Sequence, residues 1–252
     1  EISIATDGPV APSSAVHAQT TAVLRRLLGI DIDLAGFYRH ADGDPVLRRL
    51  AERFRGLKPP RFPDLFECLA NAIACQQLSL TYGIELLNRL AEAYGLRIPG
   101  VQTGAFSFPG AINLVGLEPD ALRPLGFSRQ KSEALTELAV RIERGELRIQ
   151  DLLVLTDDEA TKALRGFRGI GRWSAEYALL RGLGRLEVFP GDDVGARNNL
   201  QQWLGLNQAL EYDDVSQITS RWAPYSGLVY FHLLLDRVEN AGWLDGGRAV
   251  GE

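Results

Sequence analysis

The feature that most constrains the fold is the run of helix-length amphipathic segments that occupies most of the chain after Pro63. In the first of them, Leu65, Leu69 and Ile73 recur at helical spacing, and Asp64 before them has the side chain of a helix N-cap. No stretch after Pro63 alternates apolar and polar residues for long enough to predict a sheet. The sequence therefore predicts a mainly α-helical body.

Further helices are predicted along the same part of the chain. One covers residues 79–94 and is closed by Gly95, because glycine readily takes the left-handed turn that ends many helices. Ser128 and Thr156 are predicted N-caps of two later helices. The other predicted helices or helical turns cover residues 113–115, 120–125, 128–144 and 157–164.

Before Pro63 the pattern is mixed. Residues 1–5 alternate like a strand, and residues 21–28 and 44–55 are predicted helices. The chain starts at Glu1 and contains no Met, so we expect residues before Glu1 to be missing from this sequence. We interpret this part of the chain as a small mixed appendage on the helical body.

Composition bounds the chemistry that the chain can perform. Two Cys and three His are too few and too scattered for the usual zinc or iron–sulfur ligand sets, so no metal-dependent mechanism is predicted. Cys68 and Cys75 are expected to pack as small apolar residues on one face of a helix, in a reducing compartment. No apolar run approaches the roughly 18–20 residues that a membrane span needs. The net charge of −5 argues against a surface coated in positive charge, but not against local basic patches.

A glycine-rich turn, Gly169-Ile170-Gly171, lies between two predicted helices. Glycine at both positions permits positive φ and close approach of another backbone, and Ile170 is expected to pack between the helices. Amides at the start of the next helix, together with Arg172, would attract an anion such as a DNA phosphate. A corner in which glycine serves packing alone explains these residues equally well.

Two adjacent acids follow a second break in the chain. Pro190 and Gly191 interrupt the pattern, and Asp192 or Asp193 is expected to start the next helix. A capping carboxylate accepts backbone N–H bonds and stays ionised at neutral pH, which is the charge state that stabilises a developing cation. From these residues alone, a simple helix cap is the favoured interpretation.

The hairpin at residues 164–175, followed by Asp193, resembles the helix-hairpin-helix superfamily of base-excision DNA glycosylases. Within it, the chain is most similar to the 3-methyladenine DNA glycosylase II family. Residues 72–79 (AIACQQLS), 122–147 with their LGFSRQK core, and 221–225 (RWAPY) resemble segments of that family in the same order. The resemblance implies an enzyme that bends double-stranded DNA, rotates a damaged nucleotide out of the duplex and cuts its N-glycosidic bond.

The implied fold is a mainly α, two-lobed helix-hairpin-helix glycosylase with a small, partial α/β module at the N-terminus. We expect residues 1–40 to form the partial module and residues 64–186 the central helical lobe with the hairpin. Residues 41–63 together with 187–252 are expected to form the helical lobe that carries Asp193.

The resemblance makes Asp193 the catalytic aspartate, which stabilises an oxocarbenium-like sugar and orients or deprotonates the attacking water. Asp192 is then its supporting neighbour and the better candidate for a pure helix cap. In the hairpin, Arg168, Gly169, Ile170, Gly171 and Arg172 are the expected DNA-binding residues.

The family's base pocket corresponds to aromatic residues of this chain. Trp173 and Tyr177 stand four residues apart on one helix face, where their rings would attract a positively charged alkylated purine. Trp222 and Tyr225 are expected to contribute from a later segment. Burial in the core is the alternative for all four, and it carries more weight for Trp222 and Tyr225. Relatives often have Arg after the second of these aromatics, where this chain has Ser226, which weakens the transfer of a role to this segment.

A side chain must fill the space that a flipped base leaves in the duplex. The resemblance places this wedge at Gln77, with Leu78 as the alternative and Gln76 in a supporting role. The competing interpretation is that Gln76 and Gln77 only bond the backbone at a helix end.

The residue at position 173 separates two kinds of glycosylase. Bifunctional members of the superfamily carry a Lys there, which forms a Schiff base and then nicks the strand. This chain has Trp173, and Lys58, Lys131 and Lys162 do not match that position. We therefore expect a monofunctional glycosylase that needs no cofactor and leaves an abasic site. The sequence leaves open whether a monovalent cation binds the hairpin backbone.

The expected partner is damaged double-stranded DNA, bound by a monomer without an obligate protein partner or membrane attachment. The expected location is the cytoplasm, with the nucleoid in a prokaryote. Two alternatives remain open: the same fold acting on other damaged bases, and a non-catalytic hairpin DNA-binding module. Asp193 discriminates between enzyme and binding module, because a module that only binds DNA needs no carboxylate there.

Overall fold

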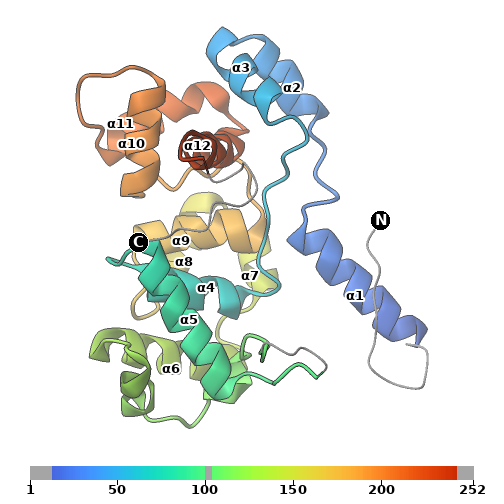
Figure 1. Ribbon diagram of the computed structural model, residues 1–252, viewed down its shortest axis with the longest axis vertical. Coiled ribbons are helices and arrows are strands. Elements are labelled where there is room, and N and C mark those ends of the chain that lie inside the picture. The colour runs from blue at the N-terminus through green and yellow to red at the C-terminus, as the bar shows by residue number, and fades with distance from the viewer. Residues whose placement is uncertain (1–12, 100–103, 243–252) are drawn as a thin grey trace. The chain divides into compact units, whose positions relative to one another are not determined.

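The computed structural model describes residues 13–99 and 104–242. These residues form helices joined by loops (Figure 1), and the pairing of Arg97 with Phe106 is an isolated antiparallel bridge. The prediction of a mainly α fold is confirmed for the described residues. The strand expected at residues 1–5 lies outside them. Across the described ranges, no helix has both the length and the apolar character that a membrane crossing requires.

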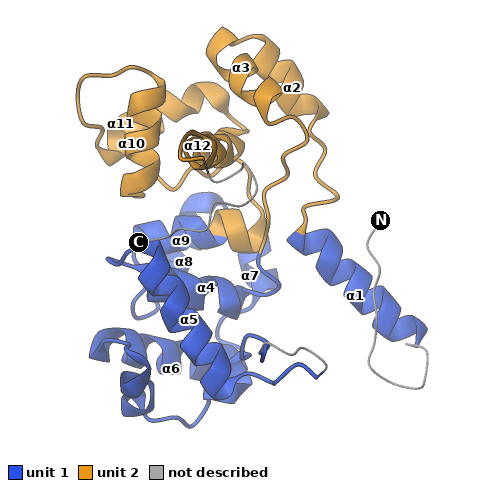
Figure 2. Ribbon diagram, in the orientation of Figure 1, with its two compact units in different colours: residues 1–27, 62–178 blue, residues 28–61, 179–252 orange. Residues whose placement is uncertain are grey.

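The chain divides into two compact units (Figure 2). Unit 1 comprises Glu1–Leu27 and Phe62–Ala178, and unit 2 comprises Leu28–Arg61 and Leu179–Glu252. The module boundary expected after residue 40 falls inside α2 (Ala35–Asp42), so it does not coincide with a division of the structure. Residues 13–40, the described part of the expected α/β module, contain helices and no strand.

Unit 1 is organised around one central helix, α4 (Leu65–Cys75). The predicted inner residues Leu69 and Ile73 are fully buried, and α4 packs against three neighbouring helices. Its side chains are so apolar because the helix has neighbours on several sides. The other helices of unit 1 are α1 (Ser14–Leu27), α5 (Leu80–Tyr94), α6 (Arg129–Glu143), α7 (Ile149–Leu153), α8 (Asp157–Arg165) and α9 (Arg172–Ala178), with short 3-10 helices at Ala111–Leu114 and Pro119–Leu125.

Unit 2 is organised around α12 (Ser226–Asn240), which packs against α3 (Pro45–Arg53) and α10 (Val194–Trp203). Its core contains large side chains from several of these helices, including Phe37, Leu47 and Leu200. The remaining elements are α2, α11 (Tyr212–Thr219), a π-helical turn at Leu179–Leu183 and a 3-10 turn at Ser220–Trp222.

The predicted N-caps are confirmed. Asp64, Ser128 and Thr156 each accept a hydrogen bond from the backbone N–H three residues further on, at 2.8, 3.3 and 3.3 Å respectively. Each of these caps is a local interaction, so the sequence alone suffices to find it.

The structure corrects the role of Gly95. This residue has φ −82°, so it does not take the left-handed turn that the sequence predicted. A Cβ at this position would lie 2.0 Å from the carbonyl oxygen of Ser107 and 2.5 Å from that of Ala91. Glycine is therefore required because the backbone at Ser107 passes so close, and not because of φ.

Candidate functional site

The glycine-rich turn joins α8 to α9 within unit 1 (Figure 1). Gly169 has φ +77°, and a Cβ there would lie 2.6 Å from the Cβ of Ala134 on α6, so both conformation and space require glycine. Ile170 is buried, as predicted. At Gly171 neither property of glycine is used: this residue, just before α9, is not among those with positive φ, and nothing lies within 4 Å of an added Cβ. One left-handed residue is enough to turn the chain here.

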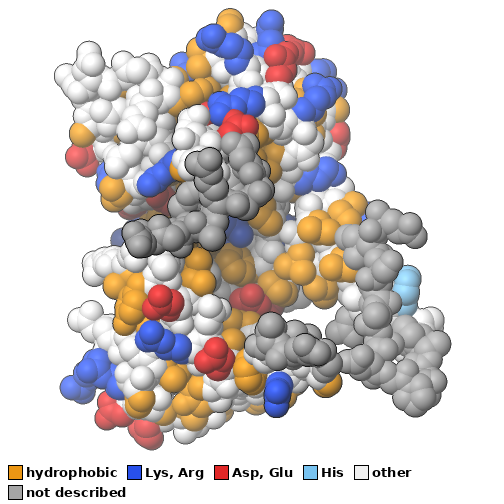
Figure 3. All heavy atoms as spheres, viewed as in Figure 1, with side chains coloured by type: hydrophobic (Ala, Val, Ile, Leu, Met, Phe, Trp, Pro, Cys, Tyr) orange, Lys and Arg blue, Asp and Glu red, His pale blue; other side chains and the backbone are white. Residues whose placement is uncertain are grey.

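Charged side chains link the hairpin to α6. Arg168 forms an ion pair with Glu133, which also accepts a hydrogen bond from Arg129 at 2.9 Å. The hydrogen bond from Arg129, with the charge of Arg168, holds the pKa of Glu133 below its ordinary range. Arg168 is half exposed, so this pair orients its guanidinium while contributing little to stability. On the face shown in Figure 3, the described Lys and Arg side chains are interspersed with Asp and Glu.

Trp173 and Tyr177 form a stacked pair on α9, with ring centroids 5.3 Å apart and an interplanar angle of 29°. Both side chains are partly exposed, so neither is enclosed in the core. The Tyr177 hydroxyl donates a hydrogen bond to Asn71 Oδ1 on α4 at 3.2 Å, and the Phe62 ring lies 6.1 Å from the Tyr177 ring. The pair is thus anchored at one end while keeping part of its aromatic surface accessible.

Two polar residues of α4 were missed by the sequence analysis. Glu67 and Asn71 are four residues apart and therefore lie on one face of the helix, and Asn71 is the residue that binds Tyr177. Burial, with a contribution from the charge of Asp64, raises the pKa of Glu67 to about 7. In the sequence, each of the two stands out as a polar residue inside an otherwise apolar helical run.

Residues 76–78, which we call the corner, connect α4 to α5. The Gln76 side-chain amide donates hydrogen bonds to the Gly169 carbonyl at 2.8 Å and to Ser174 Oγ at 2.6 Å. Gln76 therefore does more than bond the end of its own helix, because it ties the corner to the hairpin. Gln77 has φ +55°, which is unusual for a residue other than glycine, and Leu78 is 39% exposed. The wedge role of Gln77 or Leu78 stays a prediction.

In unit 2, Asp193 is the N-cap of α10. Its Oδ1 accepts a hydrogen bond from the Ala196 N–H, and its Oδ2 accepts one from the hydroxyl of Tyr230 on α12, both at 2.9 Å. The side chain is partly exposed. The prediction that Asp192 is the cap is wrong, because α10 begins at Val194 and places Asp193 in that position. Both oxygens of the carboxylate are thus held in fixed directions.

The second pair of predicted pocket aromatics lies in the packing of unit 2. Trp222 is fully buried, donates its indole N–H to Asp44 Oδ2 at 3.0 Å, and packs 5.5 Å from the Trp203 ring. Tyr225 packs edge-on against Phe37 of α2, with ring centroids 5.8 Å apart. The alternative interpretation, burial in the core, therefore applies to Trp222, because its ring is enclosed and its indole N–H is hydrogen-bonded within unit 2.

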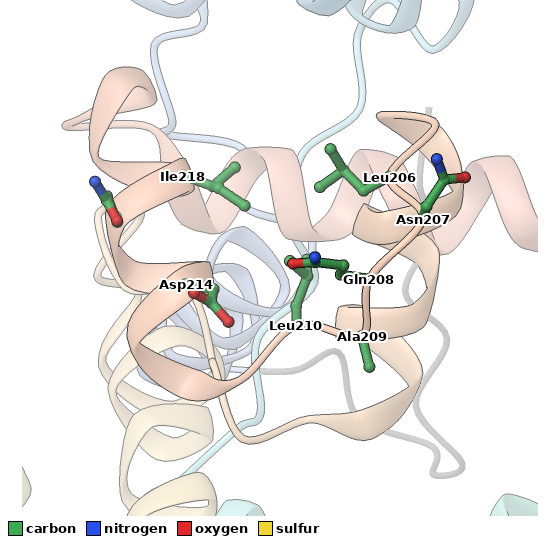
Figure 4. A pocket seen from close by; sticks show the side chains of 8 residues that line it. Leu206, Asn207, Gln208, Ala209, Leu210, Asp214 and Ile218 are labelled. Atoms are coloured by element: carbon green, nitrogen blue, oxygen red, sulfur yellow. The ribbon is translucent and has the colours of Figure 1, made fainter.

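Unit 2 also contains a surface hollow of about 460 Å³, shown in Figure 4. It is formed by the loop after α10 together with α11, and no predicted site residue lines it. The lining residues are Leu206, Asn207, Gln208, Ala209, Leu210, Asp214, Gln217 and Ile218. This hollow is therefore distinct from the candidate site. Among the described residues, no three or more His, Cys, Asp or Glu side chains converge to form a metal site.

Comparison with known proteins identifies the class of protein. Residues 70–224 match the HhH-GPD superfamily of base excision DNA repair proteins. The chain belongs to this superfamily, and its predicted helix-hairpin-helix glycosylase fold is confirmed.

Two curated relatives and one solved structure show where in the superfamily the similarity lies. The chain is 32% identical over 204 residues to the DNA-3-methyladenine glycosylase of Bacillus subtilis (strain 168), covering 81% of this chain and 67% of the relative. It is 32% identical over 189 residues to DNA-3-methyladenine glycosylase 2 of Escherichia coli (strain K12), covering 75% and 63%. The structure of the 3-methyladenine DNA glycosylase from Archaeoglobus fulgidus matches with a TM-score of 0.78 at 27% identity, over 90% of this chain and 77% of that one.

The similarity is partial in length. The chain spans 58–67% of the length of three curated relatives that it matches. Other solved structures with this fold were determined in complex with DNA; at 18% and 24% identity they show the fold alone.

Proposed function

We propose that this protein is a DNA glycosylase that excises alkylated purines of the 3-methyladenine type in base excision repair. The observation that carries the proposal is Asp193, a partly exposed carboxylate whose two oxygens are fixed by Ala196 and Tyr230. A fixed negative charge stabilises a developing cation without the cost of reorganising at the moment of reaction. Relatives named DNA-3-methyladenine glycosylase support the choice of substrate.

The proposed reaction follows from the charge of the substrate. Alkylation makes a purine cationic, so the partly exposed rings of Trp173 and Tyr177 attract it by a cation–π interaction. Cleavage of the N-glycosidic bond leaves an oxocarbenium-like sugar, which the Asp193 carboxylate stabilises. The same carboxylate orients or deprotonates the water that attacks the sugar. The hairpin around Gly169 supplies sequence-independent contacts to the DNA backbone.

We further infer that the reaction is hydrolytic, without strand cleavage. A lyase needs an amine that forms a Schiff base with the sugar, and position 173 carries Trp. Lys131 donates to two backbone carbonyls on unit 1, and Lys58 donates to the Ile30 carbonyl at 2.5 Å on unit 2. The product is then an abasic site in double-stranded DNA, formed by a monomer that requires no cofactor.

The test is release of bases from alkylated duplex DNA by the wild type and by Asp193→Asn, with and without alkali. Asn is itself a good N-cap, so this substitution keeps α10 capped while removing the charge. We expect the rate of excision to fall by about 10²–10³-fold or more, with DNA binding retained. Strand breaks that appear only after alkali treatment would establish the absence of lyase activity.

Two outcomes would redirect the proposal. If the wild type binds DNA but releases no alkylated base, other damaged bases become the candidate substrates. If no lesion is excised and Asp193→Asn changes nothing, the chain is a hairpin DNA-binding module. In either case binding should weaken steeply between about 50 and 200 mM salt, because it rests on phosphate contacts.

A further inference from the structure

Lys131 makes an interaction that the proposed chemistry does not use. It lies in the first turn of α6, and its Nζ donates hydrogen bonds to the carbonyl oxygens of Ala74 and Gln76, both at 2.7 Å. These carbonyls lie at the C-terminal end of α4, where backbone acceptors have no partner within their own helix. The ammonium thus joins the end of α4 to α6 at the point where the chain enters the corner.

The corner needs such support because it departs abruptly from helical geometry. Gln76 already has φ −56° and ψ 132°, and Gln77 follows with φ +55°. No glycine stands at either position to relax the turn. From the hairpin side, the Gln76 amide holds the corner through Gly169 and Ser174. From the α6 side, Lys131 holds it through the backbone.

An ammonium group suits this position for two reasons. It has donors to spare for two acceptors, and its positive charge interacts favourably with the negative end of the α4 dipole. The Lys131 side chain is partly buried, and this burial lowers its pKa. Within the described residues, no carboxylate forms an ion pair with Lys131, which leaves its charge directed at the two carbonyls.

We propose that Lys131 is a positioning residue that holds the corner in the shape required to occupy the space of a flipped nucleotide. The inference rests on the proposed function, since only a base-flipping enzyme needs such a wedge. A corner ordered before it meets DNA avoids the entropic cost of ordering on insertion, which would otherwise add to the cost of unstacking a base. Lys131 would thus act on flipping and excision through Gln77 and Leu78, without touching the reacting atoms.

The first test removes the ammonium with Lys131→Met, which keeps the apolar stem. We expect the single-turnover excision rate to fall by about tenfold, since misplaced groups far from the chemistry have effects of this size or larger. The fluorescence change of 2-aminopurine beside the lesion, which reports flipping, should shrink in parallel. Affinity for undamaged duplex DNA should stay within about twofold. Lys131→Arg, which keeps a cation, should recover part of the loss.

Lys58→Met is the matched control. Lys58 also donates to a backbone carbonyl, that of Ile30, and both residues belong to unit 2, whereas the corner belongs to unit 1. This variant should excise and flip like the wild type. A thermal unfolding curve shows whether Lys131→Met folds. If it does not, the partial loss of excision and flipping that we expect in Lys131→Arg tests the inference instead.

A double-mutant cycle separates positioning from general support of the fold. In a chain that carries Gln77→Ala and Leu78→Ala, the wedge side chains are gone, so adding Lys131→Met should have little further effect on flipping. If Lys131→Met reduces flipping in that background as much as it does in the wild type, the inference is overturned. It is also overturned if Lys131→Met alone flips and excises the base like the wild type. Failure of the wild type to excise any base would overturn the proposed function instead.

Discussion

The tryptophans that the sequence singled out in the two units, Trp173 and Trp222, occupy different environments. In unit 1, Trp173 and Tyr177 stack on each other and remain partly exposed, with Tyr177 anchored at its hydroxyl by Asn71. In unit 2, Trp222 is fully enclosed and its indole N–H is bonded to Asp44. The ring that is anchored at its tip belongs to a partly exposed side chain, whereas the ring that is enclosed on all sides is part of the core. Residue type alone does not distinguish these outcomes.

The largest effect should come from Trp222→Ala. Removing a fully buried indole leaves a cavity and removes its hydrogen bond to Asp44 Oδ2, so we expect the free energy of unfolding to fall by about 3–5 kcal/mol. Urea denaturation followed by circular dichroism measures this loss, and Trp173→Ala should lose much less stability. Normal stability with altered base preference in Trp222→Ala would instead place that ring in the base pocket.

A smaller effect, on catalysis, is expected from Trp173→Ala. Stacking of a base on an aromatic side chain is worth about 1–3 kcal/mol, so the excision rate should fall by about 5–150-fold. Because the attraction depends on charge, the loss should be greater for cationic 7-methylguanine than for a neutral lesion such as hypoxanthine, in single-turnover assays. Tyr177→Phe, which keeps the ring but loses the bond to Asn71, should show a milder defect. An equal loss on both lesions would indicate a packing role only.

The smallest effect should be on the pH dependence of stability, to which Glu67 in unit 1 and His232 in unit 2 are expected to contribute in opposite directions. Burial raises the pKa of Glu67 from 4.5 to about 7, so its stabilising contribution is full below 4.5 and is lost as the pH rises through about 7. Burial lowers the pKa of His232 from its ordinary 6.5, so its contribution is full above 6.5 and is lost as the pH falls.

Glu67→Gln and His232→Gln isolate these opposite slopes. In Glu67→Gln, the denaturation midpoint should decline less than in the wild type between about pH 5 and 8. In His232→Gln, the decline below pH 6.5 should be weaker. Profiles parallel to the wild type would show that neither group contributes to the pH dependence.

The sequence predicted those parts of the fold that depend on neighbouring residues. Asp64, Ser128 and Thr156 cap helices through bonds to residues three positions away, and the pattern reveals them. The choice between Asp192 and Asp193 as cap failed by one residue, because both acids follow the same break and the sequence does not fix where the helix begins.

The rest of the candidate site depends on partners far apart in the chain. Tyr230 is 37 positions from Asp193, Lys131 is 55 from Gln76, and Tyr177 is 106 from Asn71. Helical periodicity places each of these residues on a face of its own helix, but it does not say which face of which helix will meet it. These contacts therefore required the folded structure.

The backbone at Gln77 has a consequence for how this protein would change under selection. An L-residue in the left-handed region is less stable than glycine there by roughly 1–2 kcal/mol, and Gln77 occupies that region with φ +55°. A laboratory evolution experiment that rewards heat resistance alone would therefore favour Gly at position 77. If the side chain serves as the wedge, the same replacement would reduce repair. Selection for thermal stability would then favour Gly at position 77, whereas selection for DNA repair would retain Gln.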